Sequence, residues 1–215
     1  MAKEILDIVD DNGQPTGEVI DRVTAHREGI LHRTSHVWLV RMKDSRLQVL
    51  LQKRSEEKDS YPGCYDISSA GHIPAGVDFV PSALRELKEE LGVEVQAEDL
   101  VYCGQRKFHF EEIFHGERFK DNQISNVYLL WMDREAEEFQ IQKEELSEVR
   151  WFDFEECIED VKNGTIPNCI YTEELEYRNR FSIRSISSIM MFCTAATLWT
   201  RHRQSSLCRI CLRIS

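Results

Sequence analysis

Three glutamates lie close together in residues 85–92, which read RELKEELG, and their side chains could bind a metal ion. On a helix, Glu86, Glu89 and Glu90 occupy positions i, i+3 and i+4, so their carboxylates share one face. The leucines of this region fall on the opposite face, as in a stripe that packs on a core. Carboxylates this close repel one another, and a hard divalent cation such as Mg²⁺ removes that repulsion. The spacing therefore predicts a helix with a metal-binding face.

The residues around these glutamates predict a helix over 79–91. Asp78 can cap its first turn, and Gly92 suits the position just after its end. Before the helix, residues 71–76 contain two glycines and one proline and follow an expected strand at 65–68. The order is therefore strand, glycine-bearing loop and acidic helix, in which the loop backbone can approach a phosphate next to a metal-binding face.

Residues 71–93 resemble the Nudix box, whose pattern is G-x5-E-x7-R-E-U-x-E-E-x-G-U with U a bulky aliphatic residue. A run of acidic residues is usually no more than a solvated helix face, and three glutamates alone would favour that interpretation. Eight fixed positions in register favour the functional one. Val77 departs from the pattern, because the family has there its first Glu, which helps to fix the loop against the helix. The matching residues are Gly71, Arg85, Glu86, Leu87, Glu89, Glu90, Gly92 and Val93.

The resemblance implies a hydrolase that uses Mg²⁺ or Mn²⁺ to direct water at a diphosphate. Glu86, Glu89 and Glu90 resemble the metal-binding carboxylates, with Glu89 and Glu90 as the direct ligands. The Gly71 carbonyl is an additional candidate ligand. Arg85 is four residues from Glu89, so we expect it to pair with Glu89 and orient it. One carboxylate, from this helix or from a later loop, would serve as general base.

A closer resemblance covers roughly residues 5–160 and points to the isopentenyl-diphosphate isomerase branch of the Nudix superfamily. It is carried by residues 36–40 (HVWLV), 50–54 (LLQKR) and 61–72 (YPGCYDISSAGH), and it is greatest to isomerase-like Nudix hydrolases. Arg54 and Lys58 resemble positions that contact the substrate diphosphate. The alternative for both is a surface cation beside a cluster of acidic residues.

Two positions separate this chain from true isomerases. Ala70 stands where isomerases carry a catalytic Cys, and Gln123 stands where we place their catalytic Glu. Neither a methyl group nor an amide exchanges a proton at carbon, so isomerase activity is disfavoured.

Three histidines, His26, His32 and His72, resemble the histidines of the isomerase metal site. They are therefore candidates for a second metal site. A histidine is often a hydrogen-bonded structural residue instead, and that alternative stays open.

Composition restricts the classes of partner. The formal net charge is −11 over 215 residues, which argues against a general nucleic-acid or membrane-surface binder. We see no signal-peptide pattern and no apolar run long enough for a bilayer span, so we expect a cytoplasmic protein. The expected partner is a small-molecule diphosphate, and a homodimer is one state to test because the family often dimerises.

Alternating and helical patterns predict an α/β fold, a Nudix-type α/β/α sandwich around a mixed β-sheet within residues 1–177. Helices are expected at 79–91, at 154–163 and from about 172. The segment joining His26 to His32 is expected to form a turn. Strands are expected near 5–9, 36–42, 46–54, 65–68, 100–111, 124–133 and 148–153, with a turn at Asn12-Gly13 leading into 17–20.

The last segment, residues 178–215, differs sharply in composition from the rest. It holds seven arginines, seven serines and three cysteines but no lysine and no acidic residue. One interpretation is a basic tail that docks on a partner. The other is an out-of-frame or otherwise altered terminus, which the joint loss of Lys, Asp and Glu favours. We place no site in this segment.

These observations leave three hypotheses for function. The first is a metal-dependent hydrolase of a nucleotide-derived or other organic diphosphate. The second is a non-catalytic diphosphate-binding module, which Val77 and Gln123 keep open. The third is an isopentenyl-diphosphate isomerase.

Overall fold

The computed structural model describes residues 4–58, 60–114 and 116–175. The chain divides into two compact units, Met1–Thr172 and Glu173–Ser215. Nearly all elements of the described residues belong to the first unit, which carries every candidate site residue. The predicted tail at 178–215 lies outside the described residues.

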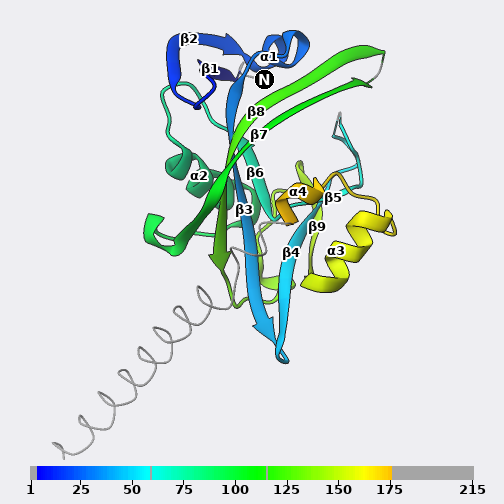
Figure 1. Cartoon of the computed structure of the whole chain (residues 1–215). Coiled ribbons are helices and arrows are strands. Elements are labelled where there is room, and N and C mark those ends of the chain that lie inside the picture. Colours follow the sequence, from blue (N-terminus) through cyan, green and yellow to red (C-terminus); the bar gives the residue numbers. More distant parts are fainter. Residues whose placement is uncertain (1–3, 59, 115, 176–215) are drawn as a thin grey trace, which may run out of the picture. The chain divides into compact units, whose positions relative to one another are not determined.

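A seven-stranded mixed sheet forms the centre of the first unit (Figure 1). β3 (His32–Lys43) runs parallel to β8 (Glu117–Trp131) and antiparallel to both β4 (Arg46–Arg54) and the short β6 (Ser69–His72). The parallel pair within an otherwise antiparallel sheet confirms the predicted mixed sheet. The remaining strands are β5 (Tyr65–Asp66), β7 (Leu100–Phe114) and β9 (Leu146–Asp153), with a separate hairpin of β1 (Ile5–Val9) and β2 (Pro15–Asp21).

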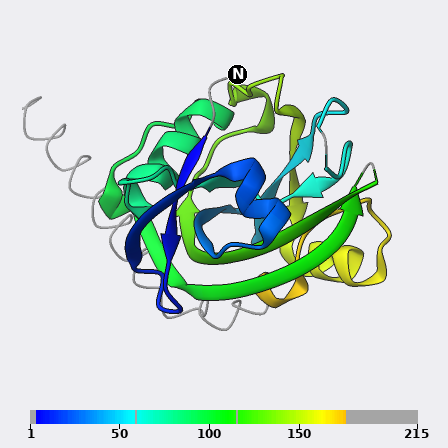
Figure 2. The same ribbon diagram turned by 90° about the horizontal axis from the view of Figure 1, so that it is seen from above.

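Two helices lie on opposite sides of this sheet, as Figures 1 and 2 both show. They are α2 (Phe79–Leu91) and α3 (Phe154–Asn163), and both were predicted with these limits. The Asp78 side chain accepts a hydrogen bond from the Phe79 amide at 2.8 Å, and Gly92 ends α2 in the left-handed region. Short elements complete the described residues: η1 (Ala97–Asp99), η2 (Ala136–Glu138) and α4 (Thr172–Leu175).

The hydrophobic core fixes the position of α2 on the sheet. Ala83, Leu87 and Leu91 are fully buried and pack in one cluster with Val37 and Leu39 of β3. This is the leucine stripe expected from the spacing, because residues three and four apart share a helix face. Packing of this stripe turns Glu86 and Glu90, on the neighbouring face of α2, toward β6.

The segment between His26 and His32 contains a helix that the sequence interpretation missed. α1 (Arg22–Glu28) includes His26, which we expected to flank a turn. The Asp21 side chain accepts from the Thr24 amide at 3.1 Å, and Gly29 closes the helix at φ 74°. Both caps are visible in the sequence, but the helix has seven residues and little periodicity on which to recognise it.

The predicted strands are present with shifted limits. β1 and β4 match the predicted ranges, whereas β5 covers only the first two residues of the strand expected at 65–68, and β6 begins after that range. β3 begins at His32 rather than at residue 36, which brings this histidine into the sheet. Within the described part of the chain, none of the helices combines the length and apolar character needed to cross a bilayer.

Candidate functional site

Glu90 is the most deeply placed acidic residue of α2. Its side chain accepts a hydrogen bond from the Ser69 hydroxyl of β6 at 2.8 Å, and the residue is 8% exposed. Burial, and next the charge of Glu86, raise the pKa of Glu90 to about 8. Carboxylates with strongly raised pKa values cluster at functional sites.

Glu86 lies against Gly71 of β6. A Cβ at position 71 would be 2.3 Å from Glu86 Cδ, so only glycine leaves room for this carboxylate. Burial raises the pKa of Glu86 to about 7, and the Glu89 carboxylate adds to the increase. Gly71 and Ser69 thus place two α2 carboxylates along one strand, with the Gly71 backbone next to them.

Arg85 and Glu89 differ from the expected pairing. We predicted that Arg85 would orient Glu89, but in the described part of the chain the carboxylate that Arg85 contacts is Glu86, and Glu89 is exposed. Arg85 Nη2 also donates to the His72 carbonyl at 3.4 Å. The reason is that Arg85 and Glu86 both reach toward β6, whereas Glu89 points to solvent.

The predicted diphosphate contacts, Arg54 and Lys58, have partners of their own. Arg54 Nη2 and Nε donate to the Ser60 carbonyl at 2.9 and 3.1 Å, and Lys58 pairs with Glu145. Among the causes acting on the pKa of Glu90, the Lys58 charge lowers it.

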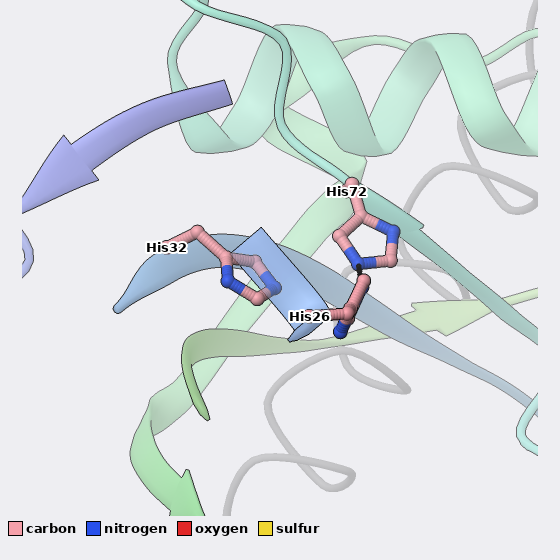
Figure 3. A group of neighbouring side chains, drawn as sticks. All are labelled: His26, His32 and His72. Carbon is pink, nitrogen blue, oxygen red and sulfur yellow. Dashed lines mark hydrogen bonds between the residues drawn. The ribbon is translucent and has the colours of Figure 1, made fainter. Parts of the chain in front are cut away.

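The histidines predicted as a second site do come together (Figure 3). The ligand nitrogens of His26, His32 and His72 lie within 4.8 Å of one another, and His26 Nε2 is 3.0 Å from His72 Nε2. They come from α1, from the start of β3 and from the end of β6. Residues far apart in sequence therefore form one cluster, which we call the tri-histidine cluster.

Burial disfavours the charged form of the imidazoles in this cluster. Burial, followed by the charge of His32, lowers the pKa of His26 to about 3, and burial also lowers the pKa of His32 and His72. His32 Nδ1 lies 2.8 Å from the Ile30 carbonyl, so it carries the proton and leaves Nε2 with a lone pair. Neutral imidazole with a free lone pair is the form that binds a metal.

Asp121 of β8 joins the tri-histidine cluster, and sequence reasoning did not assign it. Its Oδ1 lies 3.9 Å from His32 Nε2 and 4.0 Å from His26 Nδ1, too far for hydrogen bonds. Among the described residues, Asp121 Oδ1 and His32 Nε2 are buried without a hydrogen-bond partner. Burial raises the pKa of Asp121 to about 6. Buried polar atoms are rarely left unpaired, so this donor set fits a cation.

β6 connects the two groups of side chains. Its alternate residues point to opposite faces, so Ser69 and Gly71 face α2 while Ala70 and His72 face the other way. The register pairs Ala70 with His36 and pairs Gln123 with His32. The two positions that depart from the isomerase pattern therefore lie on strands beside the tri-histidine cluster, where the structure has a methyl group and an amide.

Known proteins resemble this chain in sequence. The family model described as "NUDIX domain" matches residues 31–168. Nudix hydrolase 3 of Arabidopsis thaliana is 41% identical over 166 residues, which are 73% of this chain and 20% of that protein. The chain thus spans a fifth of that relative. An uncharacterized Nudix hydrolase of Clostridium acetobutylicum is 34% identical over 146 residues, which cover 68% of each chain.

The similarity to an isomerase covers a shorter part of the chain than the similarity to these hydrolases. An isopentenyl-diphosphate Delta-isomerase of Pectobacterium atrosepticum is 38% identical over 86 residues, 40% of this chain and 46% of that protein. The expected resemblance to this branch is thus found over part of the chain.

Solved structures share the fold. The Deinococcus radiodurans protein DR0079 has a TM-score of 0.57 at 21% identity and covers 77% of this chain and 92% of its own. The NUDIX domain of Shewanella oneidensis NrtR, complexed with ADP ribose, has a TM-score of 0.52 at 19% identity and covers 70% and 88%.

Proposed function

Because the chain belongs to the NUDIX domain family of pyrophosphohydrolases, we propose that it is a metal-dependent hydrolase that cleaves a diphosphate linkage by attack of water. The observation that carries this proposal is the seating of two α2 carboxylates against β6. Glu90 is held by Ser69, and Glu86 fills the space that Gly71 leaves open. A cation shared by these two carboxylates would remove the repulsion between them, which supports the proposal.

Each residue has a role in this proposal. Glu86, Glu89 and Glu90, with the Gly71 carbonyl, would hold Mg²⁺ or Mn²⁺. The bound ion would neutralise phosphate charge and lower the pKa of a water molecule. Arg85 contacts Glu86 and so acts as an orienting residue. A carboxylate of this group, or one from a later loop, would accept the proton from the attacking water.

The substrate proposed is an organic diphosphate derived from a nucleotide. Arg54 and Lys58 are the cations we propose for its phosphates. The NUDIX domain of NrtR was solved with ADP ribose, which makes ADP-ribose a reasonable first compound. The test is phosphate and nucleotide release from ADP-ribose, nucleotide sugars, dinucleoside polyphosphates, nucleoside triphosphates and isopentenyl diphosphate, with and without Mg²⁺. Metal-dependent release supports the hydrolase and names its substrate class; no release from any compound contradicts it.

The alternative is a diphosphate-binding module without catalysis. It rests on Val77, which replaces the Glu that orders the loop in the Nudix box. We expect Val77→Glu to change kcat by less than about threefold, because the loop is already held by other groups and little is left to gain. Steady-state turnover on the cleaved compound measures this, with Val77→Gln as the uncharged control. A large gain specific to Val77→Glu would show that the natural loop is impaired and would favour the binding module.

We further propose that the tri-histidine cluster and Asp121 form a second metal site. Zn²⁺ suits three neutral imidazoles and one carboxylate. We expect one Zn²⁺ to bind per chain at this site, and we expect His32→Gln to raise its Kd by about 100-fold, since losing a ligand costs at least as much as losing an outer-shell partner. Calorimetric titration measures the Kd. His109→Gln, which changes an exposed histidine of β7, is the matched control. Equal Kd values in wild type and His32→Gln would rule the site out.

Isomerase activity ranks third. Ala70 and Gln123 offer no group that exchanges a proton with carbon, which supports hydrolysis over isomerisation. The same panel of compounds separates the two reactions, because isopentenyl diphosphate would yield an isomer without phosphate release.

A further inference from the structure

We propose that Asp7 and Arg33 are positioning residues for the metal site on α2, and that they act by fixing the loop of residues 73–78. This inference rests on the proposed function, because it concerns the same carboxylates. The loop joins β6, which supplies Gly71 and Ser69, to α2, which supplies the glutamates. Its conformation therefore sets how the two halves of the site face each other.

A buried ion pair holds the loop. Arg33 Nη2 donates to Asp7 Oδ2 and to the Val77 carbonyl, both at 2.9 Å. The same Asp7 oxygen accepts a hydrogen bond from the Gly76 amide at 2.9 Å. Asp7 is 8% exposed and Arg33 is 6% exposed. The two side chains thus bind one backbone amide and one backbone carbonyl at the turn of the loop, where water has little access and each bond is worth more than at the surface.

Further contacts hold both ends of the loop. Arg33 Nη1 lies 3.8 Å from Asp78, the residue that caps α2, and its guanidinium lies over the Phe79 ring at 5.2 Å. At the other end the Ile73 amide donates to the Arg33 carbonyl at 3.1 Å, and the Ala75 amide donates to the Ile5 carbonyl at 2.8 Å. β1 and β3 therefore fix the loop from its start to the first residue of the helix.

The arrangement does not depend on an acidic side chain at position 77. Val77 contributes its backbone carbonyl, and the carboxylate that accepts from the loop is that of Asp7. Asp7 lies in β1, before the matched family domain, which begins at residue 31. The N-terminal hairpin of β1 and β2 therefore supplies to this site a charged group from outside the matched domain.

The chain provides a matched control for this pair. Arg41, on the same strand, is also buried, at 3% exposed, and Arg41 Nη1 donates to the Arg134 carbonyl at 3.0 Å and to Glu135 at 3.1 Å. Its guanidinium lies over the Trp151 ring at 4.4 Å. Arg41→Lys therefore removes the same kinds of contact as Arg33→Lys, but at the other end of β3 from the loop.

The experiment compares Mn²⁺ affinity in the full-length wild type, Arg33→Lys and Arg41→Lys, using electron paramagnetic resonance to count free Mn²⁺. Each protein also carries His32→Gln, which removes a ligand of the proposed second site, so that the Mn²⁺ counted as bound lies at the α2 carboxylates. We expect Arg33→Lys to raise the Mn²⁺ Kd by about tenfold, the lower end of the effect of removing an outer-shell partner. Both variants should lower the melting temperature by similar amounts. Arg41→Lys, however, should leave the Mn²⁺ Kd within about twofold of wild type. With a cleaved compound in hand, kcat should fall in Arg33→Lys while KM stays near its wild-type value.

Each outcome decides the question. Equal Kd values in wild type and Arg33→Lys overturn the positioning role and leave the proposed function intact. A wild type that binds no Mn²⁺ overturns the proposed function itself. If Arg33→Lys does not fold, Asp7→Asn takes its place, since it keeps the shape and an acceptor oxygen but loses the charge. It should raise the Kd by a smaller factor, and an unchanged Kd there counts against the inference.

Discussion

Glu90→Gln is expected to abolish metal-dependent diphosphate cleavage, with kcat falling by about 1,000-fold. The amide keeps the size of the side chain and an oxygen that Ser69 can reach, but it supplies no negative charge to a cation and accepts no proton from water. Steady-state kinetics at saturating Mg²⁺ measures the effect. Glu94→Gln, which changes an exposed carboxylate just beyond α2, is the control and should retain wild-type kcat.

The same variant should make the metal-free protein more stable at high pH. The pKa of Glu90 is raised from 4.5 to about 8 on folding, so the folded state holds its proton more tightly than the unfolded state does. The stabilising contribution of the protonated carboxyl is complete below the unfolded pKa and is lost as the pH rises through the folded pKa. Glutamine does not ionise. At pH 9 without metal, we expect Glu90→Gln to exceed wild type in the free energy of unfolding by about 2 kcal/mol.

Metal reverses that order. A ligand that binds the folded state alone adds stability, so Mg²⁺ should raise the free energy of unfolding of wild type and leave that of Glu90→Gln nearly unchanged. Denaturant titrations at pH 5 and pH 9, with and without Mg²⁺, measure all four conditions. If Glu90→Gln were less stable than wild type at pH 9 without metal, ionised Glu90 would not destabilise the folded protein, which would contradict this prediction.

Gly71→Ala is the second large effect, and it should fall on metal binding more than on stability. The backbone of Gly71 is not in the left-handed region, so alanine fits the chain itself. The added Cβ would be 2.3 Å from Glu86 Cδ, so the Glu86 side chain must rotate away from β6. We expect the Mn²⁺ Kd to rise by about 100-fold and the free energy of unfolding to fall by about 1 kcal/mol.

A double-mutant cycle identifies the cause. When Glu86→Ala is already present, the space beside position 71 is open, and adding Gly71→Ala should cost almost nothing further in metal affinity or stability. The interaction energy between the two changes then equals nearly the whole effect of Gly71→Ala. If Gly71→Ala cost the same in both backgrounds, the contact with Glu86 would not be the reason that glycine is required.

Local signals predicted the two long helices. Asp78 and Gly92 stand at the two ends of α2, and Asp153 and Gly164 at those of α3, so the predicted limits agree with the structure. α1 carries equivalent caps but is too short to show a helical pattern of apolar residues, and it was expected as a turn. Capping residues therefore set helix limits well only where periodicity has already identified a helix.

The candidate site was predictable in part. The spacing of Glu86, Glu89 and Glu90 predicts that they are neighbours, but not that Glu90 is buried while Glu89 is exposed. That difference depends on where β6 crosses α2, which is set by tertiary packing. Asp121 was missed because its approach to His32 comes from the parallel register of β3 and β8, which no local pattern reveals.

The central claim is that water attacks a diphosphate at a metal site held by the α2 carboxylates. Its most direct test is turnover of the compound panel in water enriched in ¹⁸O, with Mg²⁺ or with a chelator, followed by mass spectrometry of the products. We predict cleavage of at least one compound that stops with the chelator and in Glu90→Gln, with one ¹⁸O atom in a phosphate-bearing product. A wild-type protein that binds these diphosphates and cleaves none, or that converts isopentenyl diphosphate to an isomer without phosphate labelling, would contradict it.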